Sequence, residues 1–266
     1  MICPKISSVG NIVSATIVTL GFLVTGHSAF ACLQTPSNLG LGNCKPTNIS
    51  QLKSLTLFTD ISGVHGEKEI EQLAELGVIA TTSDEFQPLA PITRGEFIAW
   101  LVKTYNELHR DPIRLPQGVT PAFPDVPASH PHFTFIQAIH DAGYLTGFED
   151  GSLRPDEVLT REQMIVLKTS LDSNVRSTAI TTPEYLRNAL RRRFNDADQI
   201  GEKYRLHILF DAANGASNFN FARVYGKTQI FAPQKPVTRA EAVIVLSRFR
   251  KGGTVERKLQ IRNRRR

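Results

Sequence analysis

The sequence predicts an all-α protein in which three divergent copies of one helix–loop–helix repeat surround a central bundle of three helices. Three observations predict this class: landmarks that recur in three blocks, a capping signal at one helix start in each block, and a nearly all-apolar helix after each signal. Such helices must be buried, and a single copy offers nothing to bury its helix against. We therefore expect the three helices to pack on one another.

The first 31 residues have the layout of a secretory signal peptide. Lys5 supplies a positive charge, an apolar stretch covers 12–24, and Ala29 and Ala31 are the small residues of a cleavage site. The apolar stretch is shorter than the roughly 20 residues of a membrane-spanning helix, so an uncleaved anchor is the less favoured alternative. We expect the protein to be exported to the cell envelope.

Two cysteines remain after removal of the leader. Cys32 and Cys44 are compatible with a disulfide in an oxidising compartment, which would pin a predicted N-terminal arm at 32–57. Cys32 would also be the first mature residue, so lipid modification of Cys32 is the second alternative. No spacing of Cys and His suggests a zinc site, and the sequence predicts no metal and no cofactor.

Each copy contains three landmarks in the same order. An aromatic-x-Asp triplet opens the block, an apolar-x-Pro triplet follows, and a Thr-Arg pair begins five positions after that Pro. This recurrence predicts copy one at 58–110, copy two at 123–172 and copy three at 194–250. The linkers are predicted at 111–122 and 173–193, the second with a short helix that begins at Pro183.

Each copy is expected to contain a first helix, a loop and a second helix. Gly77 and Gly143 are predicted to end the first helices of copies one and two, whereas the composition of 212–226 predicts an extended loop in copy three. Each second helix begins with a capping box, in which a Thr and a Glu or Gln three residues later cap each other's backbone N–H. The capping pairs are Thr93 with Glu96, Thr160 with Gln163, and Thr238 with Glu241.

An arginine occupies the first helical position after each of these Thr residues. The positive end of the helix dipole disfavours a cation there by a few tenths to about 1 kcal/mol, and the free N–H groups favour an anion. We infer that an anion compensates each charge. An external carboxylate and an opening Asp of the chain itself are both open as that anion. The three arginines are Arg94, Arg161 and Arg239.

The net charge of +6 is concentrated at the C-terminal end. The segment from Arg250 to Arg266 holds eight basic residues and one acidic residue, and without it and Lys5 the remaining body carries about −2. The basic tail at 251–266 has two interpretations. It is either a solvated, disordered segment or an arm for an anionic partner such as a polymer or lipid head groups.

These landmarks resemble the S-layer homology (SLH) domain, whose repeats combine an F-x-D start, a G-x-x-G-x-x-D-G-x-F-x-P middle and a T-R-A-E helix start. Copy two matches best with FPDVPASH, GYLTGFEDGSLRP and TREQ, copy three has TRAE at 238–241, and copy one has TRGE at 93–96. The resemblance covers about 58–249. It implies a pseudo-threefold helical spindle and non-covalent attachment to cell-wall glycans, often polymers with pyruvylated sugars.

The resemblance also implies where a glycan binds. Its carboxylate is expected in a groove between repeats, beside the arginine of the T-R-A-E motif. For the opening Asp residues, a structural role in turns is the alternative, since Asp favours caps and turns. The candidate glycan-binding residues are Arg94, Arg161, Arg239, Asp60, Asp125 and Asp196.

The sequence departs from the family pattern at positions that bear on binding. Many members carry a Trp shortly after the opening Asp, and the matching positions here are Gly66, Pro131 and Gly201. Gln163 replaces the last Glu of the helix-start motif in copy two. We therefore expect only one or two of the grooves to bind.

The sequence lacks the motifs of common enzymes, among them G-x-S-x-G, a Walker-type loop and H-E-x-x-H. The expected function is that of a non-catalytic cell-envelope protein that attaches to cell-wall polysaccharide, with no nucleic-acid partner. The alternative is a structural or protein-interaction module of the envelope that has lost glycan binding. A wall hydrolase is the least favoured class, because it would need two facing carboxylates.

Overall fold

The computed structural model describes residues 58–80, 82–116, 120–173, 175, 181–213 and 219–266. It also describes two short antiparallel strands, β1 (Val24–Thr25) and β2 (Ser28–Ala29). Apart from these four residues, the predicted leader lies outside the described residues, as does the predicted Cys32–Cys44 disulfide. The chain divides into two compact units, Met1–Leu55 and Thr56–Arg266, and the described helices belong to the second.

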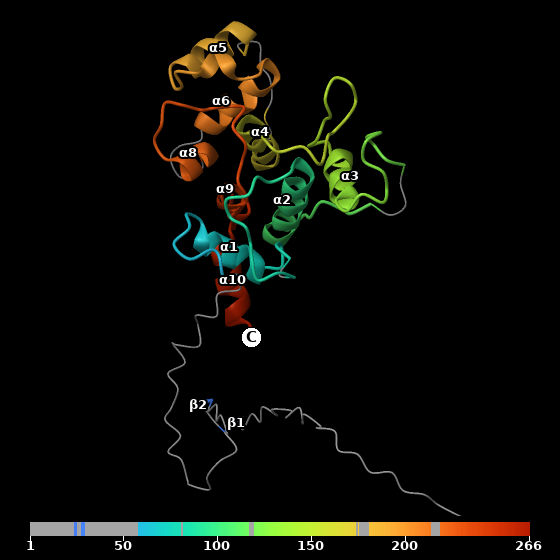
Figure 1. The fold of residues 1–266 in the computed structure, drawn as a ribbon, viewed down its shortest axis with the longest axis vertical. Coiled ribbons are helices and arrows are strands. Elements are labelled where there is room, and N and C mark those ends of the chain that lie inside the picture. The colour runs from blue at the N-terminus through green and yellow to red at the C-terminus, as the bar shows by residue number, and fades with distance from the viewer. Residues whose placement is uncertain are drawn as a thin grey trace, which may run out of the picture. The chain divides into compact units, whose positions relative to one another are not determined.

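The second unit is mostly helical, consistent with the predicted all-α class (Figure 1). Besides the helices it contains the 3-10 turns η1 (Ala197–Gln199) and η2 (Glu202–Tyr204), and a hairpin of β3 (Arg248–Phe249) and β4 (Gly253–Thr254). The helices are α1 (Glu67–Glu75), α2 (Arg94–Leu108), α3 (Phe133–Asp141), α4 (Arg161–Asp172), α5 (Pro183–Arg191), α6 (Arg205–Ala213), α8 (Asn220–Tyr225), α9 (Arg239–Leu246) and α10 (Val255–Arg264).

Several helix ends lie where the sequence predicted them. Gly77 and Gly143 follow α1 and α3 in the left-handed conformation, with φ of 84° and 77°, which a Cβ would strain. Pro183 is the first residue of α5. The extended loop predicted for 212–226 is wrong in part, because α8 forms there: the Asp211 carboxylate accepts from the first N–H groups of that helix and caps it.

The three second helices, α2, α4 and α9, contact one another. The residues two positions before them form a closed ring of backbone hydrogen bonds. Ile92 donates to Val237, Val237 to Leu159, and Leu159 back to Ile92, each at 2.9 Å. All three side chains are fully buried. The ring brings the three Thr-Arg helix starts together around one core.

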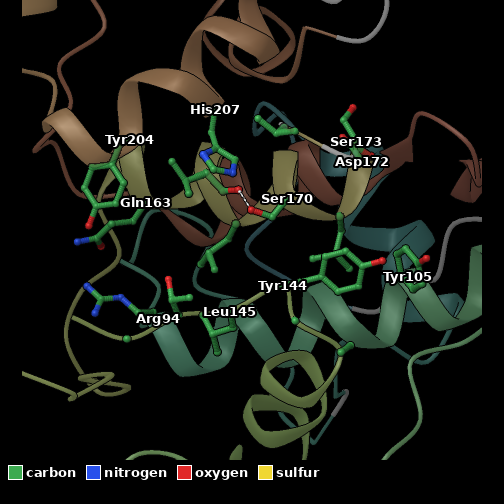
Figure 2. A pocket seen from close by; sticks show the side chains of 18 of the residues that line it. Arg94, Tyr105, Tyr144, Leu145, Gln163, Ser170, Asp172, Ser173, Tyr204 and His207 are labelled. Atoms are coloured by element: carbon green, nitrogen blue, oxygen red, sulfur yellow. Dashed lines mark hydrogen bonds between the residues drawn. The ribbon is translucent and has the colours of Figure 1, made fainter. Parts of the chain in front are cut away.

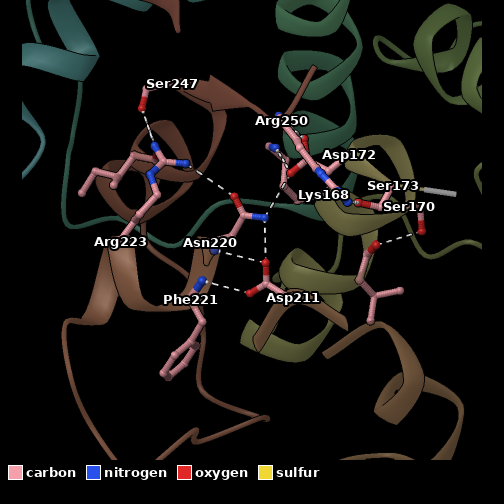
Figure 3. A network of polar contacts seen from close by, with 12 residues as sticks. Lys168, Ser170, Asp172, Ser173, Asp211, Asn220, Phe221, Arg223, Ser247 and Arg250 are labelled. Atoms are coloured by element: carbon pink, nitrogen blue, oxygen red, sulfur yellow. Dashed lines mark hydrogen bonds and ion pairs between the residues drawn. The ribbon is translucent and has the colours of Figure 1, made fainter. Parts of the chain in front are cut away.

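A buried polar network ties the region around α8 to α4 (Figure 3). Lys168 is fully buried and pairs with Asp172 one helical turn away. Asn220 donates to Asp172 at 3.1 Å and to Asp211 at 2.9 Å, and the Arg250 backbone N–H donates to Asp172 at 3.1 Å. These polar groups are hydrogen-bonded, as burial requires.

The basic tail is helical. It is therefore not the disordered segment that was one of the two interpretations from the sequence. It forms α10, which packs on α1 and α2. Val255 and Leu259, four residues apart, are its buried anchors. Acidic side chains of the earlier helices form ion pairs with two of its basic residues: Glu107 pairs with Lys258 at 3.7 Å, and Glu75 with Arg262 at 3.2 Å.

Candidate anion-binding site

The opening Asp of each copy holds a backbone turn. Asp60 accepts from the N–H groups of Phe86 and Gln87 at 2.8 and 2.7 Å, and Gln87 has a left-handed φ of 59°. The same contacts recur from Asp125 to Leu153 and Arg154 and from Asp196 to Phe231 and Ala232, with φ of 58° at Arg154 and 51° at Ala232.

These turns favour the structural interpretation of the three carboxylates. A non-glycine residue in the left-handed region is strained by about 1–3 kcal/mol and needs surrounding contacts to hold it. Among the described residues, no ion pair joins an opening Asp to a helix-start arginine, so the internal anion considered from sequence is not one of these Asp residues.

Each helix-start arginine reaches into the next copy in cyclic order. Arg94 Nη1 donates to the Leu153 carbonyl at 2.6 Å. Arg161 and Arg239 make the equivalent contacts, to the carbonyls of Phe231 at 3.2 Å and Phe86 at 2.8 Å. Each carbonyl belongs to the apolar residue of an apolar-x-Pro landmark. The three arginines thus share one backbone contact.

The carboxylates beside these arginines differ. Arg239 pairs with Glu96 at 2.5 Å, and Arg161 lies 3.8 Å from Glu241. Each Glu is the last residue of the helix-start motif in the next copy. The equivalent residue for Arg94 is Gln163, and Arg94 forms no ion pair within the described part of the chain. Arg94 is only 4% exposed, and this burial lowers the pKa of its guanidinium.

Aromatic rings close the surroundings of the other two arginines. The Tyr225 ring of α8 lies 3.7 Å from the Arg161 guanidinium, and burial raises the pKa of Tyr225, which keeps its hydroxyl neutral. The Arg239 guanidinium lies 4.8 Å from the Phe86 ring and 4.9 Å from the Trp100 ring. Sequence reasoning did not foresee the contact with Tyr225.

A pocket of about 650 Å³ lies beside Arg94. In Figure 2, Arg94, Gln163 and Tyr204 lie at one end of this pocket, and Tyr105 and Tyr144 lie at the other. The side chains come from α2, from the loop after α3, from α4, and from η2 and α6. All three sequence copies therefore contribute to its wall.

Three cations surround one ring at this pocket. The Phe148 ring centroid lies 4.5 Å from the Arg94 guanidinium, 4.3 Å from that of Arg154 and 4.8 Å from Lys203 Nζ. Arg154 pairs with Asp150 at 2.9 Å, whereas Lys203, like Arg94, has no ion pair in the described region. Two positive charges without an ion pair favour an anion at this end of the pocket.

Sequence reasoning missed Lys203, Tyr204 and His207, which lie in η2 and α6. The first helix of copy three was not recognised, so these residues had no assigned place. An interval could have found them: Tyr204 follows Asp196 by the same eight residues that separate Phe133, the start of α3, from Asp125.

Residues 57–98 and 122–165 match the S-layer homology domain. These two segments contain the opening Asp, the loop and the Thr-Arg helix start of copies one and two. Over these two segments the chain is similar to S-layer homology domains, which supports association with the cell envelope. Arg94 and Gln163, one from each matched segment, meet at the pocket (Figure 2).

Three curated proteins resemble the chain over most of its length. Exoglucanase XynX of Acetivibrio thermocellus is 28% identical over 213 residues, which cover 78% of this chain and 18% of the relative. The amylopullulanase of Thermoanaerobacterium thermosulfurigenes is 27% identical, covering 71% and 9%. The endoglucanase of Bacillus sp. (strain KSM-635) is also 27% identical, covering 67% and 17%. The chain spans less than a fifth of each relative.

None of the described helices is both long and apolar enough to cross a membrane. The described residues also contain no group of three or more His, Cys, Asp or Glu side chains placed to hold a metal ion.

Proposed function

We propose that this protein is a non-catalytic envelope protein that attaches non-covalently to an anionic cell-wall polysaccharide, such as one with pyruvylated sugars. The three copies form a pseudo-threefold spindle, for which the hydrogen-bonded ring at Ile92, Leu159 and Val237 is the support. The observation that carries the proposal is Arg94, a buried cation that lines a pocket and has no carboxylate partner in the described chain.

The electrostatics of this position favour a ligand anion. A buried charge is costly unless an opposite charge and hydrogen bonds compensate it. Beside Arg239 the Glu96 carboxylate supplies that charge. Beside Arg94 the neighbouring copy supplies Gln163, whose neutral amide does not repel an anion. A carboxylate of the glycan would then pair with Arg94 as Glu96 pairs with Arg239.

The aromatic side chains of the pocket suit a sugar. Tyr144 is 39% exposed and lines the pocket together with Tyr204 and Phe148. Aromatic faces with a polar edge pack on apolar surface while their hydroxyls remain hydrogen-bonded. We propose that these rings contact the sugar, which is the role of the Trp that family members carry after the opening Asp.

The lining of the pocket favours binding over hydrolysis. Among the described residues that line it, Asp172 carries the one carboxylate, and Lys168 pairs with it. Hydrolysis of a glycosidic bond uses two carboxylates that flank the bond. We therefore propose that the chain attaches to the polymer and does not cleave it.

Co-sedimentation with purified wall sacculi that retain their secondary polymer tests the proposal. Arg94→Gln should weaken binding at least tenfold, since a hydrogen bond to a charged group contributes about 1.5–3 kcal/mol. Arg239→Gln removes the same charge from a site already filled by Glu96 and should bind like the wild type. Thermal unfolding checks that both variants fold. Equal binding by the wild type and folded Arg94→Gln, or equal loss in both variants, would contradict the proposal.

The second candidate is a structural or protein-interaction module of the envelope. The observation that favours it is the closure of the Arg161 and Arg239 surroundings by Glu241, Tyr225 and Glu96 of the chain itself. In that case the wild-type protein should fail to sediment with sacculi at any polymer content, and the same assay separates the two candidates.

A further inference from the structure

We propose that the outward face of α10 is a docking surface for an anionic lipid bilayer. This goes beyond attachment to wall polymer, because α10 lies outside the matched segments and outside the Arg94 pocket. Two observations carry the inference. The inner face of α10 is fixed on the protein, and its outer face presents arginines that have no partner in the described chain.

The inner face fixes the orientation of the helix. Val255 and Leu259 are buried against the body. Glu256 pairs with Lys68 of α1 at 2.9 Å, and Arg262 pairs with Glu75 of the same helix at 3.2 Å. Lys258 reaches Glu107 of α2. These contacts hold α10 at both ends, so its outer face is presented in one orientation.

The outer face carries a row of charge. Arg257, Ile261 and Arg264 are spaced four and three residues apart, so they share one side of the helix. Arg265 and Arg266 follow directly. All four arginines are exposed, and none has an ion pair within the described residues. Ile261, between Arg257 and Arg264, is 42% exposed.

The chemistry of this face fits phosphate at a surface. Guanidinium groups match phosphate oxygens in two parallel hydrogen bonds. From Arg257 to Arg264 the row extends about 10 Å at the rise of an α-helix, so several head groups of a bilayer can meet it at once. An exposed isoleucine within the row favours a bilayer, where it reaches the apolar boundary, over a hydrated polymer.

The mode of contact is peripheral. Val255 and Leu259 are already packed against the body, and Ile261 is the one apolar residue of α10 on the outer face, so the helix adsorbs through charge without inserting deeply. Each arginine near an anionic surface raises affinity about fivefold, an effect that salt screens. Figure 1 shows α10 at the end of the second unit away from α6, which lines the Arg94 pocket, so both surfaces can be occupied together.

Vesicle sedimentation of the full chain tests this inference. The test variant replaces Arg257, Arg264, Arg265 and Arg266 by Gln. The matched control replaces four other exposed arginines without ion pairs in the described chain, so that both variants lose the same charge. The control positions are Arg110, Arg114, Arg192 and Arg193.

The vesicles contain about 30% phosphatidylglycerol in phosphatidylcholine, which gives them the negative charge of an anionic leaflet. The wild type and the control should sediment with these vesicles. The α10 variant should lose at least tenfold in affinity. Pure phosphatidylcholine should bind none of them, and high salt should release all. Ile261→Gln should cause a smaller loss at unchanged charge.

Three results would overturn the inference. They are equal sedimentation of the α10 variant and the control, no sedimentation of the wild type with anionic vesicles, or binding to soluble polyphosphate without binding to vesicles. The α10 variant should still bind wall sacculi like the wild type, so failure here and failure of the wall-binding proposal are distinguishable.

Discussion

The helix starts at Arg94 and Arg239 have the same local pattern and the same backbone contact, but their surroundings differ. Arg239 faces the Glu96 carboxylate and two aromatic rings of its own chain, and Arg94 faces a neutral Gln163 and a pocket. The difference comes from one position in the adjacent copy, where Glu or Gln follows three residues after the Thr. A single amide in place of a carboxylate leaves a buried cation without an ion pair beside a pocket.

The third helix start shows a different way of closing the site. Arg161 lies farther from its Glu241 than Arg239 does from Glu96, and a tyrosine from α8 covers it. The copies differ in the side chains that other copies place beside the arginine. The arginine itself stays the same.

The largest expected effect contrasts Arg161 with Arg94. Arg161→Gln should lower the free energy of unfolding by about 2–3 kcal/mol, because it leaves the partly buried Glu241 without its cation and removes the contact with the Tyr225 ring. Arg94→Gln should cost less than about 1 kcal/mol, since it removes a buried charge that has no carboxylate partner. Urea unfolding of both variants measures the difference. Equal destabilisation would mean that the two surroundings are energetically alike.

The opening Asp residues should behave alike in every copy. Asp125→Ala and Asp196→Ala should each cost about 2 kcal/mol, because two backbone N–H groups lose their acceptor at a strained turn. Urea unfolding gives the cost, and sacculi binding below the unfolding transition should be retained. Loss of binding without loss of stability in Asp125→Ala would assign that carboxylate to the ligand.

A smaller effect is the pH dependence of the free energy of unfolding that Asp211 of copy three causes. Burial raises the pKa of Asp211 to about 6, above its ordinary value of 3.8. The folded state therefore holds this proton more tightly, and the resulting stability is complete below about pH 4 and lost as pH rises through 6. The wild type should gain stability from pH 7 to 5 relative to Asp211→Asn. Parallel pH profiles of thermal unfolding for the two proteins would contradict this assignment.

A second window in the same profile belongs to Lys168. Burial lowers its pKa to about 8 from 10.5. Stability from this group is complete above about pH 10.5 and is lost as pH falls through 8, so it leaves the range from pH 7 to 5 unaffected. The two groups are therefore separable in one titration of stability.

Much of the local structure could be predicted from sequence because it depends on short-range signals. Gly77 and Gly143 end helices through backbone freedom, and Pro183 starts one. The loop predicted in copy three was wrong in part because α8 depends on Asp211, a cap supplied from a preceding helix. The sequence did not decide whether the tail is disordered or forms a binding arm. The order of the tail depends on acidic residues of α1 and α2, which lie far away in the chain.

The candidate site was predictable in its residue types but not in its asymmetry. The motif indicated all three arginines equally, and Gln163 was recognised as a departure. Its consequence for Arg94 follows only from the cyclic contact, by which each arginine meets the motif of the next copy. Lys203 and Tyr204 come from copy three. The eight-residue interval after the opening Asp could have assigned them to its first helix, but it could not have placed them beside Arg94.

The most direct measurement is a calorimetric titration of Gln163→Glu with soluble fragments of wall polymer. The new carboxylate should pair with Arg94 as Glu96 pairs with Arg239, so affinity should fall at least tenfold while the free energy of unfolding stays equal or rises. Unchanged affinity in the folded variant would contradict the claim that Arg94 is open to a ligand because its neighbour lacks a carboxylate.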